Sequence, residues 1–90
     1  MQFEWDFEKE KRNITKHGIN FQEATTVFSD PLELTIPDPD HSFNEMRWLS
    51  IAHSSENRLL VVSYTEREGR IRIISARPAV PAERRQYESN

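Results

Sequence analysis

The sequence contains no cysteine, so neither a disulfide scaffold nor a zinc site with cysteine ligands can form. Its three histidines do not include a pair at the spacing of zinc-binding histidines, so we expect no structural metal. The longest apolar run is Leu59–Val62, far short of the roughly 20 residues that span a bilayer. The first six residues also lack the basic and apolar regions of a signal peptide. These absences predict a cytoplasmic protein without a membrane segment.

Glycine is scarce as well, with two residues in the chain. The glycine-rich phosphate-binding loops, the serine-hydrolase elbow and the HExxH zinc-protease motif are all absent. Nothing therefore indicates a nucleotide cofactor, a serine hydrolase or a zinc protease, and we expect no cofactor. A chain of 90 residues is short enough to form a single domain, residues 1–90.

Charge is distributed unevenly along the chain. The net charge of −3 argues against a general nucleic-acid binder. Residues 57–90, however, carry seven arginines against four glutamates, a net charge of +3. Because guanidinium groups bind phosphate bidentately, these arginines could form a local phosphate-binding face. They could also be solvated or paired with glutamates, and charge alone favours that interpretation.

Two helices are predicted in the first 30 residues. Asp6 is a suitable N-cap for the first helix, and Gly18 stands where glycine commonly follows a helix end. Asn20 and Glu23 have the spacing of a capping box at the start of the second helix. Pro31 ends that helix, since proline cannot continue it.

Beyond residue 31 the apolar periodicity becomes that of strands. Four strands are predicted, over residues 32–36, 45–53, 58–66 and 70–77. Short connections between the last three indicate an antiparallel meander. Pro81 suits the first turn of a final helix that ends near Tyr87. The predicted fold class is therefore α+β, with two N-terminal helices, an antiparallel four-stranded sheet and a C-terminal helix.

Four arginines occupy candidate phosphate-binding positions. Arg67 lies at the turn before the last strand, Arg72 and Arg77 lie within that strand, and Arg84 lies in the final helix. A groove that combines Arg72 or Arg77 with Arg67 or Arg84 could bind one or two phosphates of an RNA strand. The alternative is a lattice of arginine–glutamate pairs between strands, which is the better interpretation for any single arginine.

Candidates for proton transfer come from several places. Glu45 and Arg47 point to the same face of one strand and could serve phosphodiester cleavage, although a solvent-facing polar row is the alternative. His17 at the end of the first helix is explained by the helix dipole but could also act as a base. Tyr87 could stack on a base or donate a proton. His41, among prolines and aspartates, is expected to be exposed.

A set of short motifs runs through nearly the whole chain. They are Phe3-Glu4-Trp5-Asp6, Asn13-Ile14-x-Lys16-His17-Gly18, Glu45-x-Arg47, Tyr64-Thr65-x-Arg67, Arg72-Ile73-Ile74-Ser75-Ala76-Arg77 and Glu83-Arg84-Arg85-x-Tyr87-Glu88. Together these motifs resemble the BrnT family of toxins from type II toxin–antitoxin systems. The resemblance implies a RelE-like fold and a ribonuclease that inhibits translation when it is free.

The resemblance also implies a mechanism and partners. It implies a metal-independent endoribonuclease that acts through the ribose 2′-hydroxyl, with no cofactor. It implies a BrnA-like antitoxin, in a heterotetramer or larger complex, through which operator DNA is bound. On positions that match the family's motifs, the catalytic candidates are His17, Glu45, Arg67 and Arg77. The candidates for RNA or phosphate binding are Arg47, Thr65, Arg72, Arg84 and Tyr87.

The negative net charge departs from the basic charge usual for a small ribonuclease. Either the arginine face is local and the acidic face serves the antitoxin or solubility, or the chain binds without cleaving. A non-catalytic RNA-binding or protein-interaction module on the same fold is therefore the alternative function. As a hypothesis, the antitoxin would cover the second face of the sheet and the arginine groove.

Overall fold

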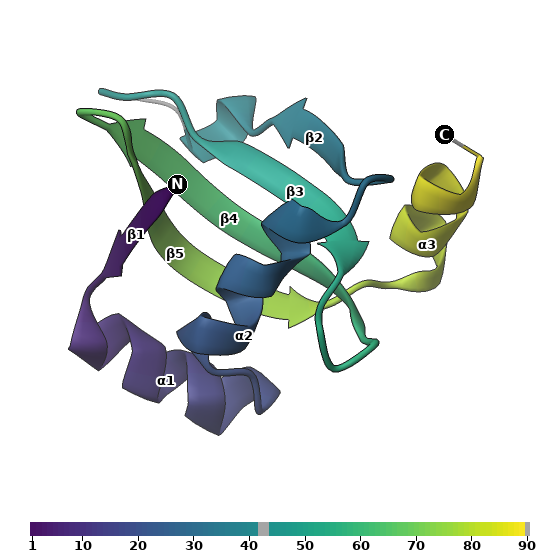
Figure 1. Cartoon of the computed structure of the whole chain (residues 1–90), viewed down its shortest axis with the longest axis horizontal. Coiled ribbons are helices and arrows are strands. Elements are labelled where there is room, and N and C mark those ends of the chain that lie inside the picture. The colour runs from purple at the N-terminus through teal and green to yellow at the C-terminus, as the bar shows by residue number, and fades with distance from the viewer. Residues whose placement is uncertain (42–43, 90) are drawn as a thin grey trace.

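In the computed structural model, which describes residues 1–41 and 44–89, five strands form one sheet and three α-helices pack around it (Figure 1). In chain order the elements are β1 (Gln2–Trp5), α1 (Phe7–His17), α2 (Phe21–Thr25), the 3₁₀ turn η1 (Thr26–Ser29), β2 (Leu34–Pro37), the 3₁₀ turn η2 (Pro39–His41), β3 (Trp48–His53), β4 (Leu59–Arg67), β5 (Arg70–Pro78) and α3 (Pro81–Glu88). The strands lie in the order β1-β5-β4-β3-β2.

The predicted RelE-like arrangement, with two N-terminal helices before a four-stranded antiparallel sheet, is wrong. The first residues form an additional strand, β1, which pairs in parallel with β5 through Phe3 opposite Ile71 and Trp5 opposite Ile73. The sheet is therefore five-stranded and mixed, although the chain is α+β. A four-residue segment is too short for its alternation to identify a strand, and its pairing depends on distant residues.

Two predicted boundaries also change for local reasons. The second helix becomes a 3₁₀ turn after Thr25, where the hydroxyls of Thr25 and Thr26 donate to main-chain carbonyls three residues earlier, 2.7 and 2.6 Å away. The second predicted strand begins at Trp48 instead of Glu45. Before it, the carbonyl of Met46 accepts a hydrogen bond from the Thr65 hydroxyl, 2.7 Å away.

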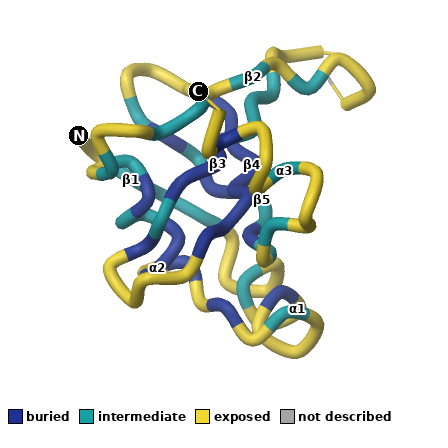
Figure 2. The backbone as a smooth tube through the Cα atoms, turned by 90° about the vertical axis from the view of Figure 1, so that its right-hand side faces the viewer, coloured by how far each residue is buried: buried dark blue, intermediate teal, exposed yellow. Residues whose placement is uncertain are grey.

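The sheet has an apolar core on each face. Leu60 and Val62 of β4 pack with α2 and η1 on one face, whereas Leu59 and Val61 pack with Tyr87 of α3 on the other. The continuous apolar run in β4 is thus explained by burial on both faces, as predicted. Figure 2 shows that the buried backbone is concentrated in the central strands. Among the described residues, no helix has the length and apolarity needed to cross a membrane.

The buried side-chain amide of Asn13 joins helix α1 to β5. The predicted caps are confirmed: the Asp6 carboxylate accepts from two backbone N–H groups at the start, and Gly18 ends the helix with φ of 71°. In between, the Asn13 side chain donates to the carbonyls of Ile19 and Ala76, each 2.8 Å away. It also accepts from the Ala76 N–H at 3.1 Å. Asn13 thus takes the place of a neighbouring strand beyond the end of β1.

Candidate functional site

Two hollows meet where α1 lies beside the C-terminal half of β5. The first, about 520 Å³, is lined by Lys9, Arg12, Asn13, Lys16, His17, Ile74, Ser75 and Arg77. The second, about 310 Å³ and on the open face of the sheet, is lined by Asp38, His41, Arg47, Leu49, Ser63, Ile74, Ser75 and Arg77. Because the two hollows share Ile74, Ser75 and Arg77, we describe these lining residues together as the basic groove.

A β-bulge lies at the point where the two hollows meet. Ser63 of β4 is opposite Ser75, but the next residue, Tyr64, is opposite Ile73, so Ile74 is the extra residue of β5. A bulge bends a strand and redirects its side chains, and bulges are common beside active sites. The bulge therefore accounts for the presence of Ile74 and Ser75 in both hollows.

The positive charge of the basic groove comes largely from α1. Lys9, Arg12 and Lys16 recur at a spacing that places them on one helical face. In the described part of the chain, none of their side chains forms a hydrogen bond or an ion pair with another residue. These three cations were not predicted as RNA ligands from the sequence. Their spacing along the predicted helix was a signal that could have identified them.

Arg77, at the centre of the basic groove, is held by the last helix. Its two terminal nitrogens lie 2.8 and 2.7 Å from the two carboxylate oxygens of Glu83. Glu83 also accepts from the Val80 N–H at 2.9 Å, at the start of α3. The hydrogen bonds from Arg77 lower the pKa of Glu83, against the effect of burial. The guanidinium thus already presents the bidentate geometry that would suit a phosphate.

A second set of arginines lies at the other end of the strands, where each meets a carboxylate. Arg67 contacts both carboxylate oxygens of Glu45, at 3.1 and 2.7 Å. Arg70 and Arg72 both contact Glu4, at 2.7 and 3.1 Å. These hydrogen bonds lower the pKa of both glutamates. We name these five residues the strand-end lattice, which corresponds to the alternative of arginine–glutamate pairs.

Tyr87 anchors α3 to the sheet. Its hydroxyl donates to a carboxylate oxygen of Asp30, 2.7 Å away, and lies 3.1 Å from Nδ1 of His53. The hydrogen bond to the Asp30 carboxylate, together with burial, raises the pKa of Tyr87 to about 12. The ring itself is buried in the smaller core. In this conformation Tyr87 has no free face on which a base could stack.

The structure therefore divides the nine predicted site residues. In the basic groove, His17 lines the first hollow, Arg47 lines the second, and Arg77 lines both. The structure places Glu45, Arg67 and Arg72 in the strand-end lattice. Thr65 is buried, and Arg84 is exposed on α3, apart from the residues that line the groove. The functional roles assigned to all nine stay predictions.

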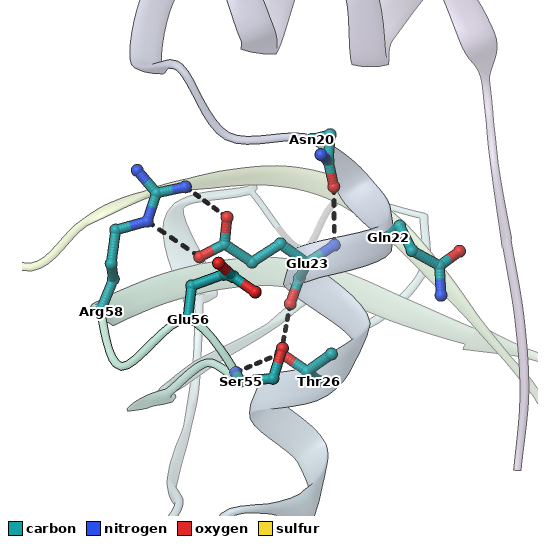
Figure 3. A pocket seen from close by; sticks show the side chains of 7 residues that line it. All are labelled: Asn20, Gln22, Glu23, Thr26, Ser55, Glu56 and Arg58. Atoms are coloured by element: carbon teal, nitrogen blue, oxygen red, sulfur yellow. Dashed lines mark hydrogen bonds and ion pairs between the residues drawn. The ribbon is translucent and has the colours of Figure 1, made fainter.

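A further hollow, about 550 Å³, lies between α2 and the turn that joins β3 to β4 (Figure 3). Its centre is an ion pair in which Arg58 contacts both carboxylate oxygens of Glu23. Ser54 also donates to Glu23, at 2.7 Å. Asn20 accepts from the Glu23 N–H at 2.7 Å, so the predicted capping box is formed on one side only. These contacts attach α2 to β4, and we assign this hollow no catalytic role.

The chain resembles known proteins both in fold and in sequence. Among curated proteins, no match is found. The crystal structure of the Brucella abortus ribonuclease toxin BrnT, at 1.1 Å resolution, superposes with a TM-score of 0.70 and 23% identity over 89% of this chain and 97% of that chain. At that identity the likeness shows the fold alone. Residues 5–83 match the family model described as ribonuclease toxin, BrnT, of type II toxin–antitoxin system. The chain therefore belongs to the BrnT family of ribonuclease toxins.

Proposed function

We propose that the chain is a metal-independent endoribonuclease that cleaves RNA through the ribose 2′-hydroxyl, with the basic groove as its active site. Membership in the BrnT family implies RNA as the substrate and an antitoxin as the partner. One observation carries the proposal: His17 and Arg77 line a single hollow together with three cations of α1. That hollow combines a proton acceptor, a phosphate ligand and a positively charged approach.

The four cations and the histidine of this hollow have roles that their chemistry supports. Lys9, Arg12 and Lys16 bind phosphates that flank the cut and hold the strand in place. Arg77 stabilises the charge that develops on the non-bridging oxygens at the phosphorus. His17 accepts the proton of the 2′-hydroxyl, which then attacks the adjacent phosphorus. The expected products end in a 2′,3′-cyclic phosphate and a 5′-hydroxyl.

The remaining predicted residues have less direct roles in this proposal. Arg47 contacts the RNA on the open face of the sheet, and Arg84 contacts a phosphate farther along the strand. Glu45 is a weaker alternative to His17 as the proton acceptor, since the hydrogen bond from Arg67 lowers the pKa of that glutamate. Thr65 and Tyr87 act by holding the elements around the groove in position.

We also propose a BrnA-like antitoxin, in a heterotetramer or a larger complex, as the partner that silences the toxin in the cytoplasm. The basic groove offers it the cations of α1 beside the partly exposed side chains of Leu49 and Ile74. An antitoxin segment with acidic and apolar side chains would complement both features. Operator DNA would then be bound through the antitoxin, because the net charge of the chain is −3.

The test is cleavage of a defined RNA by the purified chain in the presence of EDTA, with both fragment ends identified. A matched RNA with a single 2′-deoxy nucleotide at the cut site serves as the control. We expect cyclic-phosphate ends from the first RNA and no cleavage at that site in the second. Cleavage that needs a divalent metal, or cuts the 2′-deoxy site, would contradict the mechanism. If the folded protein cleaves neither free RNA nor ribosome-bound message, the non-catalytic alternative is supported.

A further inference from the structure

The guanidinium of Arg77 uses part of its hydrogen-bonding capacity within the protein. An arginine side chain has five N–H donors in a planar fork. In Arg77, Nη1 donates to Oε1 of Glu83 at 2.8 Å and to the carbonyl of Pro78 at 3.3 Å, and Nη2 donates to Oε2 of Glu83 at 2.7 Å. These three hydrogen bonds leave the Nε–H and the second hydrogen of Nη2 without a partner in the described part of the chain.

The two remaining donors of Arg77 form one edge of the guanidinium, which we name the Nε edge. They point in the same direction, which is the geometry that binds two oxygens of a phosphate. Among the described residues, the one buried side-chain nitrogen or oxygen without a hydrogen-bond partner is Nε1 of Trp5. Nε of Arg77 is therefore accessible to solvent, and the whole side chain is 37% exposed. A phosphate can approach the Nε edge without displacing Glu83.

Glu83 is held in place by contacts other than Arg77. Its Oε1 also accepts a hydrogen bond from the Val80 N–H, 2.9 Å away, at the start of α3. The far end of α3 is anchored to the sheet side by the hydrogen bond from the Tyr87 hydroxyl to Asp30, 2.7 Å long. The Glu83 side chain is 20% exposed. Its carboxylate is thus a fixed point that orients the guanidinium.

We propose that Glu83 is a positioning residue for RNA cleavage, which holds Arg77 by one edge while the phosphate at the cut site binds the Nε edge. The inference rests on the proposed function of the basic groove, in which Arg77 stabilises the charge at phosphorus. An arginine that is free to rotate loses side-chain entropy when it binds. Because Glu83 already orients the guanidinium, its donors are in place before the charge develops, and donors oriented in advance stabilise that charge best.

The negative charge of Glu83 has a different effect on RNA affinity. It partly offsets the positive charge that a phosphate meets at Arg77, so removal of this carboxylate should not weaken binding. The proposal therefore predicts that loss of Glu83 slows the cleavage of bound RNA without lowering the affinity for RNA. If Glu83 served only to stabilise the start of α3, its loss would not separate these two quantities.

Single-turnover cleavage at saturating protein, compared with binding of an RNA with a 2′-deoxy cut site, tests the proposal. We expect Glu83→Ala to slow cleavage by about 10-fold or more, as for a misoriented catalytic group. It should bind the 2′-deoxy RNA at least as tightly as the wild type. Glu83→Gln keeps one oxygen that can accept from Arg77, so it should recover part of the rate.

The matched charge control is Glu88→Gln, on the same helix. The Glu88 side chain is exposed and, among the residues that the structure describes, forms no hydrogen bond or ion pair. Its substitution changes the net charge by the same amount as Glu83→Gln, and the cleavage rate should equal that of the wild type. Circular dichroism checks that every variant is folded.

A double-mutant cycle shows whether Glu83 acts through Arg77. In the Arg77→Ala background, Glu83→Ala should cause no further loss of cleavage, because the group that it orients is already absent. If Glu83→Ala does not fold, Glu83→Gln in both backgrounds gives the same cycle.

Three outcomes would overturn the proposal. The losses of the two single variants could multiply in the double variant, Glu83→Ala could cleave at least as fast as the wild type, or it could lose affinity in proportion to its rate. Cleavage faster than the wild type would mean that the carboxylate competes with phosphate for Arg77. Failure of the proposed function itself would be seen in the wild type, which would then not cleave RNA or would leave other fragment ends.

Discussion

The basic groove and the strand-end lattice are both rich in cations, but the two regions use them differently. In the lattice, Arg67, Arg70 and Arg72 each contact a glutamate at hydrogen-bonding distance. In the groove, the cations of α1 have no such partner among the described residues, and Arg77 is held by Glu83 from α3. The number of arginines in a region is therefore a poor guide to a phosphate site. A better guide is whether a carboxylate already binds each cation.

The difference has a physical basis. A phosphate that binds an arginine of the lattice must first displace the carboxylate of Glu45 or Glu4, which lowers the net gain in free energy. A phosphate that approaches Lys9 or Lys16 displaces only water and counterions, and their release favours binding. Arg77 is the intermediate case, since its carboxylate partner also caps the start of α3.

The largest expected difference between the two regions is in catalysis. We expect Arg77→Ala to slow single-turnover RNA cleavage by about 100-fold or more, because the charge at phosphorus loses its stabilising donor. Arg67→Ala should stay within a few-fold of the wild type, since Arg67 is not among the residues that line the basic groove. Circular dichroism of both variants checks that they are folded. If the two variants lost cleavage activity equally, Arg67 would belong to the active site. The distinction between the two regions would then be wrong.

The next largest effect is on the stability of the groove itself. Asn13→Ala removes a buried amide that makes three hydrogen bonds, to Ala76 twice and to Ile19 once. We expect the free energy of unfolding to fall by about 2–3 kcal/mol, as for buried backbone groups left without partners. Urea denaturation measures this change. A stability unchanged from the wild type would show that the amide does not hold α1 against β5.

Much of the local structure was predictable from neighbouring residues. The caps at Asp6 and Gly18 depend on side chains and backbone angles within one turn of α1, so both predictions are confirmed. The burial of Leu59–Val62 on both faces of the sheet follows from four consecutive apolar residues. β1 was missed because its partner in the sheet lies 68 positions away, as Phe3 opposite Ile71 shows.

The site was harder to predict for the same reason. Whether an arginine is neutralised depends on contacts such as Arg72 with Glu4 or Arg58 with Glu23, which join residues far apart in the sequence. The spacing of residues within a single strand gives no information about partners on distant elements. The cations of α1 were the exception, because their spacing on one helical face needs no tertiary contact. Helical periodicity applied to charge, and not only to apolar residues, would have found them.

A smaller effect concerns binding by single cations. Lys16→Ala should lower the slope of log affinity against log salt by about 0.7, the value for one contact with a single-stranded phosphate. The matched control is Lys11→Ala, since Lys11 lies on the same helix but outside the groove, 4.0 Å from Glu8. Anisotropy of an RNA with a 2′-deoxy cut site, measured over a salt series, gives both slopes. Identical slopes for the two variants would mean that the face of α1 does not bind phosphate.

The smallest expected effect is a change in the stability of the strand-end lattice at acid pH. The hydrogen bond from Arg67 lowers the pKa of Glu45 from an ordinary value of 4.5. The stabilisation by this pair is therefore complete above pH 4.5 and is lost as the pH falls through the lowered pKa of the folded state. Glu45→Gln lacks the titrating group, so the stability difference between the wild type and this variant should shrink on acidification. Both side chains of the pair are nearly half exposed, so the difference should be slight and should weaken further in salt.

The control for this last prediction is Glu66→Gln, on the same strand as Arg67. The Glu66 side chain is exposed and, within the part of the chain that the structure describes, forms no hydrogen bond or ion pair. The urea midpoint of this variant should therefore follow that of the wild type through the acid range. If instead Glu45→Gln follows the wild type at every pH, the Arg67–Glu45 pair contributes nothing to stability. Arg67 could then leave Glu45 for a phosphate at little cost, and the contrast between the lattice and the groove would weaken.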